Sequence, residues 1–212
     1  MTTVERPVVR QFREPHARAA AKHVRAGGHA IVWETGGKAR LLFPVPRADD
    51  TMDLGYWSLL DLGRNRWRRV KSGPYRGLAS AMVPKDCHDI VRRRAERDSV
   101  WPGPTKKSRF DCLTCGACCR DNRVELDTAD VARFERAAMP HLARSPYARR
   151  EEDGTIVLRL LRDKSCRHLG GDNKCAIYTL RPSACSQFPV GSECCLISRE
   201  EELGLFDGLP AD

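Results

Sequence analysis

The sequence contains no long apolar run. A helix that crosses a bilayer needs about 20 consecutive apolar residues, and no stretch of the 212 residues comes near that length. The first residues, Met1 to Pro7, also lack the apolar core of a secretory signal. We therefore expect a cytoplasmic protein that does not associate with a membrane.

The common catalytic motifs are absent as well. The sequence has no Walker A loop, no G-x-G-x-x-G, no H-E-x-x-H and no G-x-S-x-G. These absences argue against the common nucleotide-dependent and hydrolytic enzymes. They leave open whether the chain is an enzyme of another kind.

Positive charge is concentrated in the first half. Residues 1–107 hold 22 Lys and Arg against 11 Asp and Glu, a balance of +11, whereas residues 108–212 hold 15 against 17, a balance of −2. A basic surface can bind an acidic protein, a peptide or nucleic acid. Because no nucleic-acid recognition motif accompanies the charge, we favour a solvated surface over a nucleic-acid site. A protein or peptide partner remains compatible with this charge, and the oligomeric state is not determined by it.

The first half is nearly free of cysteine. It holds Cys87 alone, and the other nine of the ten cysteines lie after residue 107. A reducing cytoplasm keeps thiols unpaired, so stable disulfides are not expected. Thiols gathered in one region of such a protein usually bind metal or carry out redox chemistry. Cys87 is remote from this group, and we interpret it as a packed thiol.

Four of the cysteines form the run C-x2-C-x2-C-C. Two residues between cysteines let a tight turn aim both sulfurs at one point, and sets of thiolates bind Zn²⁺ or iron–sulfur clusters. Cys118 and Cys119 are neighbours whose side chains diverge in extended backbone, so both sulfurs fit one tetrahedral ion poorly. The pair indicates two metal centres, one bridged polynuclear centre, or one ligand beside a spare thiol. The candidate metal ligands are Cys112, Cys115, Cys118, Cys119, Cys166, Cys175, Cys185 and Cys194.

Two residues near these candidates receive other roles. Cys195 directly follows Cys194 and is interpreted as a spare thiol or a small apolar residue. His168 lies two residues after Cys166 and could be a ligand, but we favour a partly exposed polar residue or a group that supports the ligands.

The first half shows patterns of both helix and strand. Helices are predicted over 14–26 and 85–98, strands over 29–34 and 39–45, and a second hairpin over 56–62 and 67–71. Gly36-Gly37 favours a tight hairpin turn between the first two strands. Pro44 and Pro46 lack a backbone donor and place the strand 39–45 at a sheet edge. The polar residues 1–13 are expected to be loose.

The second half is predicted to be less regular. We expect a helix over 127–138 with Asp127 or Thr128 as its cap, a strand over 155–161, a turn over 170–173 and a mobile acidic tail from Arg199. Residues 101–104 form a Pro/Gly segment that suits a linker. The prediction is an α+β protein with two parts. A small basic α+β module, residues 1–107, precedes an irregular cysteine-rich metal-binding domain, residues 108–212, with one or two helices.

The cysteine-rich half resembles a known family in four blocks of sequence. The blocks are Phe110-Asp-Cys112-Leu-Thr-Cys115-Gly-Ala-Cys118-Cys119, Cys166-Arg-His-Leu169, Cys175-Ala-Ile-Tyr178 and Arg181-Pro182-Ser-Ala-Cys185-Ser-Gln-Phe188-Pro189. In this order they resemble the CxxCxxCC cysteine-cluster family, whose members are described as zinc- or iron-chelating proteins. The resemblance covers about residues 109–195 and does not extend to residues 1–107.

The resemblance implies a metal-chelating domain in which the seven shared cysteines, from Cys112 to Cys185, are the ligands. A related cysteine cluster occurs in flagellin lysine N-methylases, where an iron–sulfur centre is implicated, and this relation favours iron–sulfur slightly over zinc. We therefore predict a cytoplasmic protein with one or two iron–sulfur or zinc centres and an accessory, maturation or redox role in a biosynthetic or modification pathway. The alternatives are an iron-dependent enzyme acting on a peptide or small molecule, and a binding module for an acidic partner or nucleic acid with structural zinc.

Overall fold

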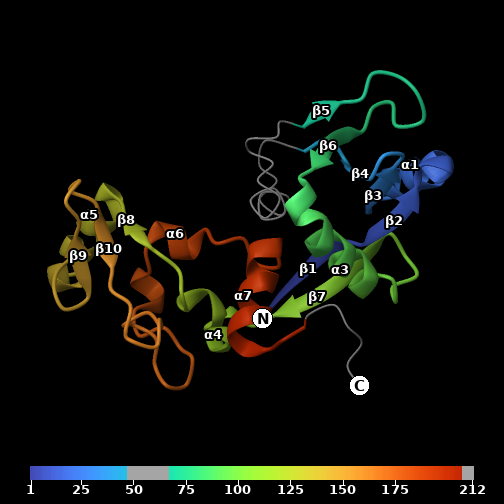
Figure 1. Ribbon diagram of the computed structural model, residues 1–212. Coiled ribbons are helices and arrows are strands. Elements are labelled where there is room, and N and C mark those ends of the chain that lie inside the picture. Colours follow the sequence, from blue (N-terminus) through green and yellow to red (C-terminus); the bar gives the residue numbers. More distant parts are fainter. Residues whose placement is uncertain (47–66, 207–212) are drawn as a thin grey trace. The chain divides into compact units, whose positions relative to one another are not determined.

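A computed structural model describes residues 1–46 and 67–206 of the protein (Figure 1). The chain divides into two compact units. The sheet unit comprises Thr3–Arg109, Gly191–Leu196 and Phe206, and the cysteine unit comprises Met1–Thr2, Phe110–Val190 and Ile197–Leu205. Both helices and strands are present, and the cysteine-rich part contains helices, so the predicted fold class is confirmed. The division into domains at residue 107 stays a prediction, because a compact unit need not fold alone.

A mixed five-stranded sheet forms the centre of the sheet unit. Its order is β2-β3-β4-β6-β5. The strands are β2 (Val9–Arg13), β3 (His29–Glu34), β4 (Lys38–Phe43), β5 (Arg68–Arg69) and β6 (Ala79–Val83). β2 and β3 are parallel, with Val9 opposite His29, and the other neighbours are antiparallel.

One helix connects the two parallel strands and covers one face of the sheet. Parallel neighbours require a crossover, which η1 (Glu14–His16) and α1 (Ala17–Arg25) provide. Gly27, with a φ of 102°, then turns the chain into β3. The apolar face of α1 packs on the sheet, and this cluster comprises Ala20, Ala21, Val24, Ala30, Val32, Leu42 and Leu78.

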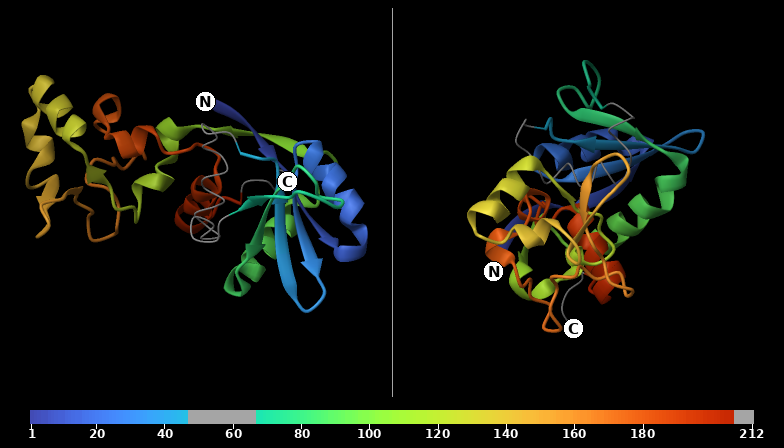
Figure 2. Two further views of the ribbon diagram at one scale, coloured as in Figure 1. Left: turned by 90° about the horizontal axis from the view of Figure 1, so that it is seen from above. Right: turned by 90° about the vertical axis from the view of Figure 1, so that its left-hand side faces the viewer.

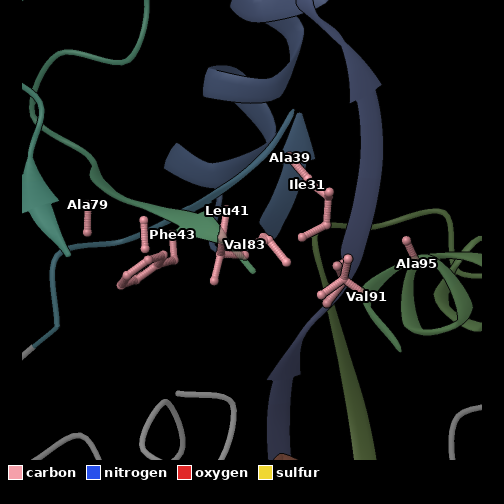
Figure 3. Packing of buried hydrophobic residues seen from close by; sticks show 10 residues of the cluster. Ile31, Ala39, Leu41, Phe43, Ala79, Val83, Val91 and Ala95 are labelled. Atoms are coloured by element: carbon pink, nitrogen blue, oxygen red, sulfur yellow. The ribbon is translucent and has the colours of Figure 1, made fainter. Parts of the chain in front are cut away.

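A second helix covers the opposite face. The helix α3 (His88–Asp98) follows η2 (Lys85–Cys87), and its Val91 and Ala95 pack with Ile31, Leu41 and other residues of the sheet (Figure 3). Side chains alternate between the two faces of a strand, so Ile31 meets α3 while its neighbours in the chain meet α1. Figure 2 shows the two helices on either side of the sheet.

Several predictions for this unit are confirmed. The two helices form where they were expected, each with a short 3-10 turn at its start. The hairpin between β3 and β4 turns at Gly36 and Gly37, whose φ angles are 80° and 73°. The strand predicted over 56–62 lies outside the described residues.

Two predictions for this unit are wrong. Residues 1–13 are not loose, because they form β1 (Thr2–Pro7) and β2, and Val8 and Val9 are buried. The apolar pair Val8-Val9 indicates a buried strand, but the prediction followed the polar residues around it. β4 is a central strand rather than an edge strand, since it ends at Phe43, one residue before the first proline, and therefore loses no backbone donor.

A buried ion pair ties three elements of the sheet unit together. Lys106 on β7 (Thr105–Phe110), a strand that pairs with β1, contacts Asp98 at the end of α3. The other carboxylate oxygen of Asp98 accepts a hydrogen bond of 2.8 Å from the backbone N–H of Val9 in β2. Both side chains of the ion pair are less than a tenth exposed. Each charge is therefore stabilised mainly by its partner and only weakly by water.

The cysteine unit has a small apolar core. A three-stranded antiparallel sheet of β8 (Glu125–Leu126), β10 (Ile156–Leu158) and β9 (Ala148–Arg150) packs near α5 (Thr128–Arg136) and η4 (Pro140–Ala143). The buried cluster comprises Leu126, Phe134, Leu142, Ala148, Leu158 and Ile177. These are six side chains, against ten and seven in the two clusters of the sheet unit. Apolar burial therefore contributes less to the stability of the cysteine unit than to that of the sheet unit.

The predictions for this half have mixed outcomes. The helix 127–138 is confirmed as α5, with Asp127 as its cap. The predicted strand 155–161 is reduced to β10. The mobile tail is wrong up to Leu203, because α7 (Glu193–Leu203) continues through the acidic residues from Arg199. Among the helices in the described ranges, none is long and apolar enough to cross a bilayer.

Candidate metal centre

The first two cysteines of the run lie on one helical turn. α4 (Cys112–Cys115) begins after Asp111, whose carboxylate accepts hydrogen bonds from the Leu113 N–H at 3.2 Å and the Thr114 hydroxyl at 3.0 Å. Residues three apart in a helix share a face. The cap therefore places the thiols of Cys112 and Cys115 on the same side of the turn.

Gly116 turns the chain so that the next two cysteines can join the first pair. Its φ is 64°, in the left-handed region that favours glycine, and η3 (Ala117–Cys119) follows at once. A Cβ at this position would lie 3.1 Å from the Cβ of Asn173 and 3.1 Å from Leu169 Cδ1. Gly116 thus allows both the turn and close packing of the run against the later loop.

We expect Gly116→Ala to destabilise the cysteine unit by about 1–2 kcal/mol, because alanine at positive φ is strained and its methyl group crowds Asn173. Urea denaturation of the metal-loaded variant would measure the change. Gly154→Ala is the matched control: its φ is 87° but nothing lies within 4 Å of the new methyl group. An equal loss in both variants would show that the close approach to Asn173 carries no cost.

Backbone pairing brings the later cysteines to the run. The N–H of Cys166 donates to the carbonyl of Cys119 at 2.7 Å. Cys175 pairs with Leu169 across the predicted turn, where the Gly170 N–H donates to the Lys174 carbonyl at 2.8 Å. The turn over 170–173 is therefore confirmed, and it returns Cys175 toward the run.

A buried carboxylate holds the last of the seven cysteines in place. Cys185 lies on α6 (Ser183–Ser186), and Oδ1 of Asp130 accepts hydrogen bonds from both the N–H and the hydroxyl of Ser183, each 2.8 Å long. Asp130 is fully buried and also pairs with Arg133, which in turn donates to the carbonyl of Arg181 at 3.0 Å. Asp130 and Arg133 together fix the backbone on both sides of Pro182.

Hydrogen bonding keeps Asp130 ionised. Burial alone would raise its pKa. The hydrogen bonds from Ser183, from the backbone N–H of Asp127 and from Arg133 outweigh burial and lower the pKa below its usual range. A carboxylate with a lowered pKa stabilises the fold fully above its unfolded pKa and loses this contribution only as the pH falls through the lower folded value. The contribution of Asp130 is therefore constant from pH 6 to pH 8.

We expect Asp130→Asn to lower the free energy of unfolding of the metal-loaded protein by about 1–3 kcal/mol, equally at pH 6 and pH 8. The amide keeps the shape of the side chain but cannot pair with Arg133. Asp127→Asn is the control, because asparagine caps a helix as well as aspartate does. Urea denaturation at both pH values would compare the two variants, and equal stability of both would contradict the role given to Asp130.

Electrostatic interactions join all seven thiols into one group. Cys118 acts on the pKa of Cys112, Cys119 and Cys185, and Cys115 acts on that of Cys112. Two further thiols, Cys166 and Cys175, act on the pKa of Cys119 and of Cys185. These pairwise interactions link all the thiols into one connected group, although not every pair interacts directly; the group comprises Cys112, Cys115, Cys118, Cys119, Cys166, Cys175 and Cys185.

The thiols of the adjacent pair interact through a hydrogen bond. A hydrogen bond from Cys119 lowers the pKa of Cys118 to about 7, and the same bond raises the pKa of Cys119. Burial, followed by the neighbouring thiols, raises the pKa of Cys185 to about 12. Burial and the neighbouring thiols therefore disfavour several thiolates at once. A bound cation would offset this negative charge.

Two arginines supply positive charge to this group. Nη1 of Arg199 lies 2.9 Å from the sulfur of Cys115, and its guanidinium covers the ring of Phe110 at 5.5 Å. Arg181 lies over the ring of Tyr178 at 4.1 Å. Its positive charge favours the thiolates of Cys112 and Cys118, but burial still raises the pKa of Cys112. Tyr178 belongs to η5 (Tyr178–Leu180). Both guanidinium groups are therefore fixed by aromatic rings beside the thiols.

The donor set fits a thiophilic metal, although no coordination sphere is closed. Within residues 1–46 and 67–206, no three His, Cys, Asp or Glu side chains are already close enough to hold one ion. Pairwise electrostatic interactions nonetheless link the seven thiols, none of them is in a disulfide, and two arginines offset part of their charge. Soft thiolates suit zinc and iron–sulfur clusters, so the residues present fit either group.

The remaining predicted residues lie elsewhere or have other surroundings. Cys194 belongs to the sheet unit, so its role as an eighth ligand stays a prediction. Cys195 is buried, and Cys87 packs against the α3 face of the sheet. His168 is buried rather than partly exposed, and it stacks on Tyr147 with a ring separation of 4.8 Å.

Sequence reasoning missed two residues of the site. Asp130 stands three residues after Asp127, and this spacing forms a capping box, which is visible in the sequence. Its bonds to Ser183 are not visible, because they join residues 53 positions apart. Arg199 lay in the segment that was expected to be mobile.

Comparison with known proteins finds one family that matches the cysteine-rich half. Residues 111–204 match the model of the family CxxCxxCC, described as a "putative zinc- or iron-chelating domain". The cysteine-rich segment is therefore similar to this family over residues 111–204. The match covers a little under half of the chain and extends beyond the expected end at 195 to include α7. No curated protein and no solved structure matches the chain.

Proposed function

We propose that the cysteine-rich domain of this protein holds one or two iron–sulfur or zinc centres, with Cys112, Cys115, Cys118, Cys119, Cys166, Cys175 and Cys185 as the ligands and Cys194 as a candidate eighth. The observation that carries the proposal is the convergence of seven free thiols from three separate stretches of the chain. A family match to a zinc- or iron-chelating domain supports it independently.

The charge balance around the thiols supports a metal in particular. Four thiolates around one Zn²⁺ leave a net charge of −2, and an iron–sulfur cluster with four thiolates is also anionic. Arg199 donates to the sulfur of Cys115, and the charge of Arg181 acts on Cys112, so both arginines would neutralise part of this charge. Cysteine would supply the ligands, and the bound group would supply electron transfer if iron–sulfur, or structural stabilisation if zinc.

The adjacent pair favours iron–sulfur over a single zinc ion. A hydrogen bond joins the thiols of Cys118 and Cys119, and neighbouring thiols serve a polynuclear centre more easily than one tetrahedral ion. We propose an accessory, maturation or redox role in the cytoplasm, in which the domain serves a partner protein of a biosynthetic or modification pathway.

The test is to purify the protein without oxygen and to measure its visible spectrum, metal content and acid-labile sulfide. Broad visible absorption with stoichiometric iron and sulfide is the expected result. A colourless protein with stoichiometric zinc would exclude the redox role but keep the metal site. A protein without metal, whose cysteines are paired in disulfides, would refute the proposal.

One observation favours an iron-dependent enzyme as the second candidate. Cys112 is exposed, whereas the other six thiols of the group are partly buried, so one side of the centre would face solvent. An enzyme needs such an open coordination position. Adding azide or cyanide to the iron-loaded protein would separate the two functions, because only an open position changes the spectrum.

A further inference from the structure

A short basic hairpin leads into the metal centre. This basic hairpin comprises residues 159–167, directly after β10. The Leu161 N–H donates to the Ser165 carbonyl at 2.8 Å, and the Arg167 N–H donates to the Arg159 carbonyl at 3.2 Å. Leu160 pairs with Cys166 in antiparallel register. The hairpin is therefore ordered, and its second strand carries one of the proposed ligands.

This register places two arginines directly opposite each other. Because Leu160 is opposite Cys166, Arg159 is opposite Arg167, and their side chains share one face of the hairpin. Both are exposed. Like charges directly opposite on paired strands destabilise a sheet, so folding alone does not account for this pair.

The acidic residues near the hairpin do not neutralise the pair. Asp163 accepts hydrogen bonds from the N–H and the hydroxyl of Ser165 at 3.0 and 2.7 Å, and Asp121 pairs with Lys164 at 2.7 Å. Within the described part of the chain, Arg159 and Arg167 have no acidic partner. Their charge is therefore available to a second molecule.

An exposed leucine lies on the same face as the arginine pair. Leu161 is two residues after Arg159, so it shares that face, and it is 41% exposed. The face thus combines an apolar side chain with two unpaired guanidinium groups. Arginine is enriched in protein–protein interfaces, where lysine, serine and alanine are depleted, and an exposed apolar side chain beside it adds surface that a partner can bury.

We propose that the basic hairpin is the docking surface for an acidic segment of a partner protein, with carboxylates at Arg159 and Arg167 and an apolar side chain on Leu161. This inference rests on the proposed accessory role, in which the centre serves a second protein. The phosphates of nucleic acid would engage the arginines but not Leu161, and an anionic membrane would need a larger apolar face. Docking here would bring the partner next to Cys166.

The decisive variant is Arg159→Glu. This variant reverses the charge that the partner would contact. It also replaces the Arg159–Arg167 like-charge pair of the hairpin by an opposite-charge pair. We expect weaker docking together with an unchanged or higher melting temperature. A merely structural role for Arg159 predicts the opposite effect on the melting temperature.

The probe is a fluorescein-labelled octapeptide of alternating Glu and Leu, followed by fluorescence anisotropy with the full-length protein as purified. We expect Arg159→Glu to weaken binding about tenfold, a loss typical of a reversed charge at an interface. Arg136→Glu is the matched control, because Arg136 is exposed at the end of α5, outside the hairpin. It should leave peptide affinity unchanged.

Three results would overturn the proposal: no binding of the peptide, an equal loss in the control variant, or a lower melting temperature for Arg159→Glu. Phosphatidylserine vesicles and a single-stranded oligonucleotide serve as competing probes, and tighter binding of either with the same sensitivity to Arg159→Glu would also overturn it. Metal content is measured in every sample. Peptide binding by a protein without metal would refute the proposed metal function and leave the docking surface intact.

Discussion

Removal of the metal is expected to unfold the cysteine unit and to leave the sheet unit folded. The sheet unit buries two apolar clusters on the two faces of its sheet, whereas the cysteine unit has one cluster of six side chains. Structural metal contributes about 10–16 kcal/mol of apparent binding free energy to small thiolate sites. Without it, the cysteine unit would also keep several thiols whose environment penalises their charge.

The measurement compares thermal unfolding before and after chelation under reducing conditions. We expect the loaded protein to show the transitions of both units, and the chelated protein to show only that of the sheet unit. Hydrogen exchange followed by mass spectrometry would assign the loss of protection to residues 110–190. Cys87→Ser is the control, since Cys87 lies in the sheet unit and should respond to chelation as the wild type does. Identical transitions with and without chelator would contradict a stabilising metal.

Asp98→Ala is expected to destabilise the sheet unit by about 3–5 kcal/mol, the loss typical when one partner of a buried ion pair is removed. Lys106 would keep its charge in a site where its side chain is 2% exposed. The Val9 N–H would lose its acceptor at the same time. Both losses act on the junction of α3, β7 and β2.

Urea denaturation of the sheet-unit transition would measure this effect. The double variant Asp98→Leu with Lys106→Met should recover part of the stability, because it removes the unpaired charge but still leaves the Val9 N–H without its partner. Asp89→Ala is the control, since Asp89 forms an exposed pair with Arg92 and should change stability by less than about 0.5 kcal/mol. A loss below about 1 kcal/mol in Asp98→Ala would show that the ion pair is not buried in solution.

Local sequence signals predicted much of the sheet unit. The alanine-rich face of α1, the apolar run in β3 and the Gly36-Gly37 turn each follow from residues close together in the chain. β2 was missed because its signal is weak: it is a short segment whose strand character depends on parallel pairing with β3, 20 residues away. Hydrogen bonding to β3 thus makes this segment a strand although its own composition does not predict one.

The sequence indicated the candidate ligands of the cysteine unit, whose binding of metal stays a prediction, but it did not indicate the residues that support them. The spacing of the run and the family blocks predicted which thiols belong together. Asp130 and Arg199 could not be assigned, because their roles depend on contacts 53 and 84 residues away. In the sequence, Asp130 resembles any helix-capping carboxylate and Arg199 any helical arginine. Only the fold shows their contacts with Ser183 and Cys115.

The most direct test of the central claim is X-ray absorption spectroscopy at the metal edge of the protein purified without oxygen. The proposed ligands predict a first shell dominated by sulfur at about 2.3 Å, with about four sulfur atoms for each metal. A first shell made only of nitrogen and oxygen, or a protein that retains no metal, would contradict the account.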